Sequence, residues 1–318
     1  MFKFNKSTKI IFFGTSDRSL PILESLKSNF DLALCVTKKN TLFGRDQVEK
    51  ETEVKRWATT NNVDTLLIDS LKDNNLEYVL DKIKSIKPDY GIVADFSFMI
   101  PKKVIETFNG NLINIHFSLL PKYRGASPVQ HAILNGDEKT GITFYLLNEK
   151  MDDGDIISKI EYYIDSKYTS GELYDLLFKI SADELPNVIK GYSLGELIPY
   201  KQLEEEATYT ISKTNPKHTF IFKEDAQIDW KQPPEIIERS IRAYNPWPIA
   251  WSYLVELENS TCLSEKIILK NHVNKNLKVK IFKAEILGKK LQIEEIQVEG
   301  KNKTEWKSFK NGYVEKTI

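Results

Sequence analysis

The sequence predicts an α/β protein in which a doubly wound, mostly parallel sheet is followed by a small, OB-like β-barrel domain. Short apolar runs alternate with helical spacing over the first part of the chain, and short runs of alternating polarity follow Ile228. Polar residues are also concentrated between Asn114 and Asp155, where we expect the functional site. The length of 318 residues suggests about two domains, and 41% apolar residues can fill a core in each.

The first predicted strand covers residues 9–13 and ends at a loop that begins with Gly14. Leu20, Leu23 and Leu26 follow at the spacing of one helix face. Four further apolar runs are expected to be strands, and helical crossovers between them would make the sheet parallel. These runs cover residues 32–36, 65–68, 91–94 and 112–115. A dinucleotide-binding turn needs three glycines where this loop has one, so we expect no nicotinamide cofactor.

A long helix is expected to close the first domain, because Thr169 and Glu172 have the spacing of a capping box. After Gly191 the helical pattern breaks into a polar stretch, which indicates an exposed linker. The runs of alternating polarity that suggest the β-barrel cover residues 249–255, 277–282 and 291–298. We therefore expect a first domain at residues 1–193, a linker at 194–222 and a second domain at 223–318.

Charge and cysteine usage favour a cytoplasmic protein without a metal site. The net charge is zero, but residues 211–318 contain 19 basic and 14 acidic side chains. Such a local excess can attract a polyanion, although a solvated surface produces it just as often. Cys35 and Cys262 lie too far apart in sequence for a metal cluster, and we expect both to be reduced thiols. No apolar run approaches the roughly 20 residues of a spanning helix, and the first residues run into a strand pattern.

The strongest candidates for catalysis are Asn114 and His116, which lie two positions apart in a predicted strand. Side chains alternate between the two faces of a strand, so this amide and this imidazole should project from the same face. A single histidine near a strand end is more often a structural residue than a catalyst. Here the polar sequence that follows it, through Asp155, favours catalysis.

Several motifs in this stretch resemble the folate-dependent formyltransferase family. The family pattern is Asn-x-His, then Ser-Leu-Leu-Pro, then Leu-Asp-x-Gly-Asp, and this chain reads Asn114-Ile115-His116, Ser118-Leu119-Leu120-Pro121 and Met151-Asp152-Asp153-Gly154-Asp155. The resemblance places Asp152 at the catalytic aspartate and Asp153 at a variable position. Residues 225–230 and 241–251, with Trp230, Trp247 and Trp251, are similar to the C-terminal domain of the same family, and we expect the three tryptophans to pack a helix against the β-barrel.

The resemblance implies a formyltransferase-type, Rossmann-like first domain that uses 10-formyltetrahydrofolate as co-substrate and no metal. Asn114 and His116 would donate hydrogen bonds to the oxygen that becomes anionic during transfer, and Asp152 would favour protonated His116 and orient a proton-relaying water. The residues expected to form the wall of the folate site are Ser118, Leu119, Leu120 and Pro121. Asp155 is expected to serve as a turn residue, and His131 as a surface or packing residue.

Within this family the acceptor could be the amine of methionyl-tRNA, of glycinamide ribonucleotide or of a nucleotide-linked amino sugar. The second domain disfavours glycinamide ribonucleotide, whose enzymes resemble the first domain alone. Gly44-Arg45 matches a Gly-Arg pair of the branch that acts on charged initiator methionyl-tRNA, and an Arg45 guanidinium suits a phosphate or a base edge. We therefore expect a monomer that formylates methionyl-tRNA. A sugar-nucleotide N-formyltransferase is the alternative, and an inactive RNA-binding relative is disfavoured because all three polar catalytic positions are present.

Overall fold

The structure is a computed structural model that describes residues 7–43 and 48–315. The chain forms two compact units. The first contains the chain up to residue 124, together with residues 141–162 and 174–208. The second contains residues 125–140 and 163–173, together with the chain from residue 209 onward.

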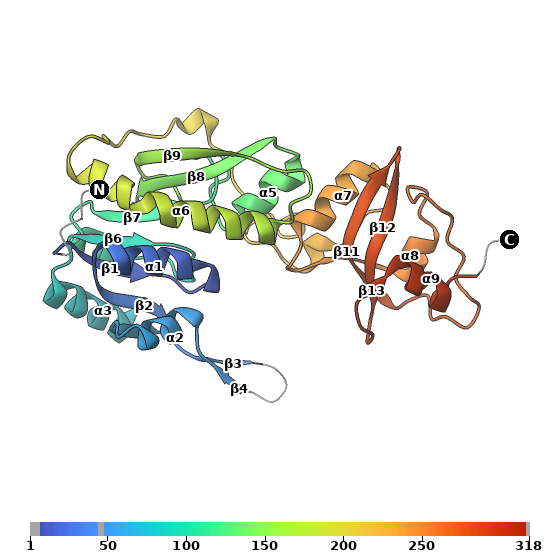
Figure 1. Cartoon of the computed structure of the whole chain (residues 1–318), viewed down its shortest axis with the longest axis horizontal. Helices are drawn as coiled ribbons and strands as arrows, with labels where there is room; N and C mark the ends of the chain where they lie inside the picture. The colour runs from blue at the N-terminus through green and yellow to red at the C-terminus, as the bar shows by residue number, and fades with distance from the viewer. Residues whose placement is uncertain (1–6, 44–47, 316–318) are drawn as a thin grey trace. The chain divides into compact units, whose positions relative to one another are not determined.

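A seven-stranded sheet with the order β5-β2-β1-β6-β7-β8-β9 is the centre of the first unit (Figure 1). Its strands are β1 (Lys9–Phe13), β2 (Asp31–Lys38), β5 (Thr65–Ile68), β6 (Tyr90–Val93), β7 (Leu112–His116), β8 (Lys139–Leu146) and β9 (Ile156–Tyr163). The five strands from β5 to β7 in this order pair in parallel, whereas β8 pairs antiparallel with β7. The predicted mostly parallel sheet is confirmed. Strands β8 and β9 were not predicted, and β8 is buried along most of its length, so it lacks the polar alternation that marks a half-exposed strand.

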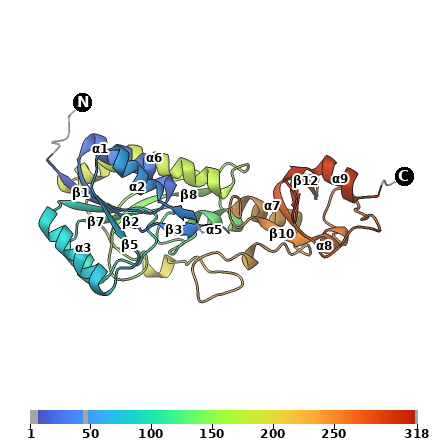
Figure 2. The ribbon, with the colours of Figure 1, turned by 90° about the horizontal axis from the view of Figure 1, so that it is seen from below.

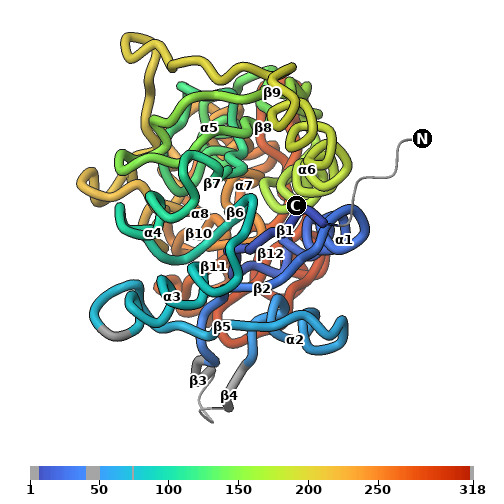
Figure 3. Tube along the Cα trace, turned by 90° about the vertical axis from the view of Figure 1, so that its left-hand side faces the viewer, coloured from blue at the N-terminus to red at the C-terminus, as the bar shows by residue number. Residues whose placement is uncertain are grey.

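Helices cover both faces of this sheet. On one face lie α1 (Leu20–Asn29), α2 (Glu53–Thr60) and α6 (Ser170–Ser193), and on the other lie α3 (Asp73–Ile86) and α4 (Lys102–Thr107) (Figures 2 and 3). Ile11 and Phe13 of β1 pack in the cluster that includes the buried residues of α3 and α4. A two-stranded ribbon, β3 (Thr41–Phe43) and β4 (Val48–Lys50), follows β2. The Glu172 carboxylate accepts hydrogen bonds from the Thr169 backbone N–H and hydroxyl, as the predicted capping box requires.

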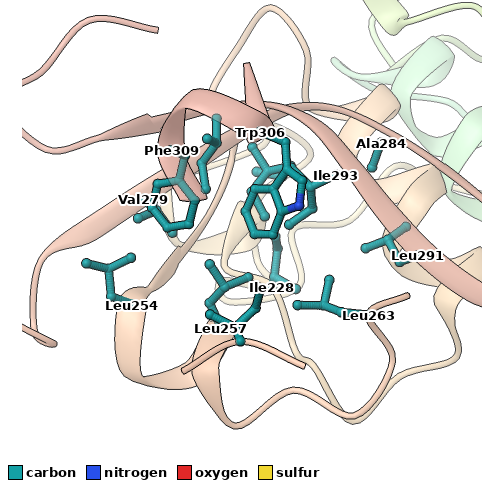
Figure 4. Close-up of a cluster of buried hydrophobic side chains, with 14 of the residues drawn as sticks. Ile228, Leu254, Leu257, Leu263, Val279, Ala284, Leu291, Ile293, Trp306 and Phe309 are labelled. Carbon is teal, nitrogen blue, oxygen red and sulfur yellow. The ribbon is translucent and has the colours of Figure 1, made fainter. Parts of the chain in front are cut away.

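The second unit contains a four-stranded antiparallel sheet with the order β10-β11-β12-β13, which confirms the predicted small β domain. The strands are β10 (Ala250–Tyr253), β11 (Lys278–Leu287), β12 (Lys290–Val298) and β13 (Thr304–Glu305), and the helices are α5 (Pro128–Asn135), α7 (Pro234–Ala243), α8 (Leu254–Glu258) and α9 (Trp306–Tyr313). Figure 4 shows its core, where Trp306 stacks on Phe309 with ring centroids 4.9 Å apart. Among the residues described here, no helix is both long and apolar enough to cross a membrane.

The predicted packing of the three tryptophans is partly wrong. The indole N–H of Trp230 donates to the Ser252 hydroxyl at 2.8 Å, and that of Trp251 donates to the Lys223 carbonyl at 2.7 Å. Trp247, in contrast, is 52% exposed. The proline residues on both sides of Trp247 form cis peptide bonds with their preceding residues.

Asp225 is a buried carboxylate that organises the segment leading into this domain. It accepts hydrogen bonds from the hydroxyls of Ser212 and Thr214 and from the backbone N–H groups of Thr214 and Phe222. Burial by itself would raise the pKa of Asp225, but the hydrogen bonds from Phe222, Thr214 and Ser212 outweigh it, and the pKa lies below its ordinary value of 3.8. The folded state therefore favours the ionised form.

Replacing Asp225 with asparagine is expected to lower the free energy of unfolding at pH 7 by about 1–3 kcal/mol, because an amide directs its own N–H toward groups that already donate. A pKa lowered by folding stabilises the protein fully above the unfolded-state pKa, and this contribution is lost as the pH falls through the folded-state pKa. Chemical denaturation should therefore show a difference between wild type and Asp225→Asn that shrinks below pH 3.8. A difference that stays constant from pH 7 to pH 3 would contradict this role.

Candidate active site

The register between β7 and β8 brings four polar side chains to one face of the sheet. Asn114 is paired with Tyr145, and His116 is paired with Thr143. Directly paired residues of antiparallel strands point to the same face, as do residues two apart in one strand. Ile115 lies between the two polar positions of β7 and is buried on the opposite face. The predicted common orientation of Asn114 and His116 follows from this geometry.

The loop between β8 and β9 brings Asp152 next to Tyr145 and His116. The Asn114 side-chain N–H donates to the Tyr145 hydroxyl at 2.7 Å, and this hydroxyl donates to Asp152 Oδ1 at 2.7 Å. The second oxygen of Asp152, Oδ2, lies 3.7 Å from His116 Nδ1. Asn114, His116 and Asp152, which we predicted to be catalytic, are thus adjacent in the structure, with Tyr145 between two of them.

His116 is held in one orientation, and its side chain is only 7% exposed. Its Nε2 lies 2.9 Å from the carbonyl oxygen of Tyr123. A carbonyl oxygen only accepts, so Nε2 is the protonated nitrogen of the neutral ring. The other ring nitrogen, Nδ1, is too far from Asp152 for a hydrogen bond. This geometry leaves Nδ1 as the ring nitrogen that can meet a reacting group without a change in the orientation of the ring.

The backbone of the Asp152 loop is anchored by Gln202, from the segment after α6. The Gln202 amide nitrogen donates to the carbonyl oxygens of Asp152, at 2.8 Å, and Gly154, at 2.9 Å. Its Oε1 accepts from two nitrogens of Arg124, Nε at 3.1 Å and Nη2 at 3.0 Å. The position of Asp152 therefore depends on a chain of contacts between segments about 30 to 80 residues apart in sequence.

Arg124 is the centre of this anchor and is almost completely buried, with 1% of its side chain exposed. Its Nη2 lies 2.8 Å from Asp153 Oδ1, and its Nη1 lies 2.8 Å from Glu204 Oε2. A buried guanidinium requires such partners, because an unpaired charge in a protein interior is costly. Asp153, at the variable position of the family motif, is a charge partner of Arg124 in this chain.

Gly154 and Asp152 give the loop its close approach to β8. A Cβ atom at Gly154 would collide with the carbonyl oxygen of Leu146, so glycine is required at this position. Asp152 has a φ of 48°, in the left-handed region that aspartate and asparagine tolerate better than most residues. The aspartate and glycine of the motif therefore have conformational reasons to be there in addition to chemical ones.

The predicted folate wall begins directly after β7 and is anchored on β8. The Thr143 hydroxyl donates to the Ser118 carbonyl at 2.7 Å and accepts from the Leu120 N–H at 3.1 Å. The side chains of Ser118, Leu120 and Pro121 are buried, and Leu120 packs with Tyr145. Leu119 is the partly exposed residue of the four. The structure thus places the segment beside the polar cluster, with Leu119 as its partly exposed side chain.

The loop that follows β6 lies at the same edge of the sheet as the end of β7, because β6 and β7 are parallel neighbours. Thr15, which follows β1, donates its hydroxyl to the Asp95 carbonyl of this loop and lies 2.8 Å from the Ser97 hydroxyl. Met99 is 71% exposed, and Phe96 and Phe98 pack against the core. Arg45, the predicted tRNA contact, lies outside the described residues. Among the described residues no group of histidine, cysteine, aspartate or glutamate side chains could hold a metal ion.

Comparison with known proteins agrees with this geometry. Residues 8–189 match the model for the formyl transferase family, and residues 221–314 match the model for the formyl transferase C-terminal domain. The chain belongs to the formyl transferase family. Asn114, His116 and Asp152 all lie within the first match.

Two relatives with assigned names are similar over most of their length. A methionyl-tRNA formyltransferase of Clostridium acetobutylicum is 38% identical over 77% of this chain and 76% of the relative. One of Bacillus velezensis is 33% identical over 96% of this chain and 95% of the relative. The solved structure of methionyl-tRNA formyltransferase from Clostridium thermocellum aligns with a TM-score of 0.57 at 21% identity, over 92% of this chain and 98% of that one, and supports the fold.

Three residues that organise this candidate site were not assigned a role by the sequence reasoning. Tyr145 lies in a strand that was not predicted, so its pairing with Asn114 could not be anticipated. Gln202 lies in a segment that was interpreted as an exposed linker. Arg124 lies in the polar stretch between Asn114 and Asp155, but Asp153, Glu204 and Gln202, which contact it, come from other parts of the sequence. His131, which was expected to be a surface or packing residue, is half-buried, with Nδ1 2.8 Å from the Ser127 carbonyl.

Proposed function

We propose that this protein transfers a formyl group from 10-formyltetrahydrofolate to the amino group of charged initiator methionyl-tRNA, for translation initiation. The observation that carries the proposal is the 33% identity to a methionyl-tRNA formyltransferase over 96% of the chain, a length that includes the second unit. The alternative, a sugar-nucleotide N-formyltransferase with the same donor, has no comparable support in the named relatives reported above.

The residues of the site suit formyl transfer to an amine. The bound folate supplies the formyl group, and Leu119 with the loop that carries Met99 would hold its ring system. Asn114 uses one amide N–H for Tyr145, which leaves the other to donate to the formyl oxygen as negative charge develops there. His116 Nδ1, when protonated, can donate to the same oxygen.

Asp152 would manage the proton of the attacking amine. The amine must lose a proton when its bond to the formyl carbon forms, and the folate nitrogen must gain one when its bond breaks. The carboxylate of Asp152 is 15% exposed and can orient a water that carries the proton from one nitrogen to the other. No covalent bond to the protein is required.

The second domain, at residues 223–318 in our proposal, would bind tRNA with its excess of basic side chains. We expect a monomer that acts in the cytoplasm, where tRNA is charged. Residues 194–222 would link this domain to the catalytic domain at residues 1–193. Sedimentation of the purified protein with and without tRNA tests both the monomer and the binding.

The acceptor is tested directly by incubating the purified protein and 10-formyltetrahydrofolate with two kinds of amine. One reaction contains charged initiator methionyl-tRNA, and the other contains nucleotide-linked amino sugars. Formylation of the tRNA with no turnover of the sugars is the expected result. Formylation of an amino sugar alone would replace the proposed acceptor by the alternative.

Arg45→Ala is expected to weaken the use of methionyl-tRNA by about 1 kcal/mol, the lower end of the ~1–3 kcal/mol range of a guanidinium contact. Asp46 beside Arg45 and the lack of further lysines directly after it dilute the positive charge of this loop. Arg45→Lys should restore part of the loss, because an ammonium lacks the planar fork. The measurement is kcat/KM for charged tRNA, with the Kd of a folate analogue as control. An unchanged kcat/KM would remove Arg45 from the tRNA site.

A further inference from the structure

The hydroxyl of Tyr145 joins two groups that the proposed mechanism uses. It accepts from the Asn114 amide at 2.7 Å and donates to Asp152 Oδ1 at 2.7 Å. The side chain is fully buried, and its ring packs with Leu120 and Ile156. A tyrosine in this cluster needs partners for its hydroxyl, and here both partners are predicted catalytic residues.

The direction of both hydrogen bonds is determined by the chemistry of the partners. The amide nitrogen of Asn114 only donates, and an ionised Asp152 only accepts. The hydroxyl has one proton, so it must point this proton at Asp152 and receive the N–H of Asn114. Burial, followed by the charge of Asp152, raises the pKa of Tyr145 well above its ordinary value of 10.0, so the hydroxyl keeps its proton at neutral pH.

This arrangement orients Asn114. Its amide could otherwise rotate to exchange nitrogen and oxygen, but the Tyr145 hydroxyl has no second proton with which to satisfy the Asn114 oxygen. The nitrogen is therefore held on the side of Tyr145, and its second N–H remains to donate to a reacting oxygen. A flipped amide would present a carbonyl to that oxygen and repel the developing charge.

The same hydroxyl also orients Asp152. It binds Oδ1, which leaves Oδ2 as the oxygen nearest His116 Nδ1, at 3.7 Å. Gln202 holds the backbone of Asp152, but its contacts do not determine the rotation of the carboxylate. Hydrogen bonds arranged in series also polarise one another, so the donation from Asn114 strengthens the bond to Asp152.

We propose that Tyr145 is a positioning residue for formyl transfer, whose hydroxyl holds the Asn114 amide and the Asp152 carboxylate in the orientation that the reaction requires. The inference rests on the proposed formyl transfer but not on which amine accepts the group. The residue would act through its two neighbours and would not touch the substrate.

Tyr145→Phe tests this proposal, because it removes the hydroxyl and keeps the ring that packs with Leu120. We expect kcat to fall about 10- to 100-fold, while KM for charged tRNA and the Kd of a folate analogue change by less than about twofold. Tyr192→Phe is the matched control, since it removes a hydroxyl that donates to the Gly110 carbonyl at 3.3 Å. Its kcat should equal that of the wild type. Melting temperatures of both variants close to that of the wild type would show that kcat is compared between folded proteins.

A double-mutant cycle separates positioning from a general loss of stability. In an Asn114→Ala background, Tyr145→Phe should lower kcat by a smaller factor than in the wild type, because one of the two groups that it orients is gone. A second cycle with Asp152→Ala should give the same result, so the test does not depend on one pair of variants. An equal loss from Tyr145→Phe in the wild type and in both backgrounds would overturn the proposal, as would an unchanged kcat in Tyr145→Phe itself.

The failure of this inference can be distinguished from that of the proposed function. If the wild type and Tyr192→Phe both fail to formylate methionyl-tRNA, the proposed acceptor is wrong. The cycle is then measured with the amino sugar that the wild type does formylate. If the wild type is active and Tyr145→Phe matches it, the acceptor stands and the positioning role of Tyr145 is rejected.

Discussion

Replacement of Asp152 with asparagine is expected to lower kcat for formyl transfer by about 100-fold or more, because the site loses the charge that guides the proton. Asparagine tolerates the φ of 48° at this position, and its side-chain oxygen can still accept from Tyr145. The substitution therefore removes the charge and keeps the geometry. Steady-state kinetics with charged tRNA should show the loss in kcat, with a folate-analogue Kd near that of the wild type.

Asn114→Ala and His116→Ala should lower kcat by about 100- to 1,000-fold, the usual effect of removing a donor to a developing anion. Asp155→Asn is the control, since Asp155 belongs to the same loop but is expected to be a turn residue. Near wild-type kcat in any of the three catalytic variants would remove that residue from the mechanism. A larger loss in Asp155→Asn than in Asp152→Asn would mean that the wrong aspartate was chosen.

Arg124→Ala is expected to lower the free energy of unfolding by about 3–5 kcal/mol, because it leaves Asp153 without its buried charge partner. The carboxylate of Asp153 is 18% exposed and lies 2.8 Å from the guanidinium. Gln202 would lose both of its hydrogen bonds from Arg124 at the same time. The measurement is chemical denaturation, in which the unfolding transition of the first unit is fitted separately from that of the second unit.

Glu204→Gln is the matched control for Arg124→Ala. Glu204 also pairs with Arg124, but its side chain is 69% exposed, and an ion pair with an exposed partner contributes little, about 0–1 kcal/mol. If both variants destabilise the protein equally, or if Arg124→Ala has no effect, the buried pair is not the anchor described above. Folded Arg124→Ala protein should also have a reduced kcat, because the loop that carries Asp152 is held through Gln202.

The local pattern of the chain was sufficient to predict the parallel part of the sheet. The runs at residues 9–13, 32–36, 65–68, 91–94 and 112–115 correspond to β1, β2, β5, β6 and β7. A central parallel strand is buried on both faces, and so its sequence is apolar throughout. The capping box of α6 was equally local, because its two residues are three positions apart.

The relation between Asn114 and His116 was also determined by the sequence alone. The two residues are two apart in a strand, and the alternation of a strand puts them on one face whatever surrounds it. The family motifs added Asp152 to this pair. No local rule could have placed Asp152 beside them, because the loop that carries it is attached to β8 and β9.

The tertiary structure decided which groups hold these residues in place. Tyr145 meets Asn114 through the register of β7 and β8, and Gln202 meets Arg124 from 78 positions away. Local periodicity reports whether a residue faces the core, but it contains no information on which distant residue lies opposite. That information resides in strand order and register, which depend on the packing of the whole sheet. The amino-acid sequence by itself therefore determined which reacting groups are present, and the fold determined how they are oriented.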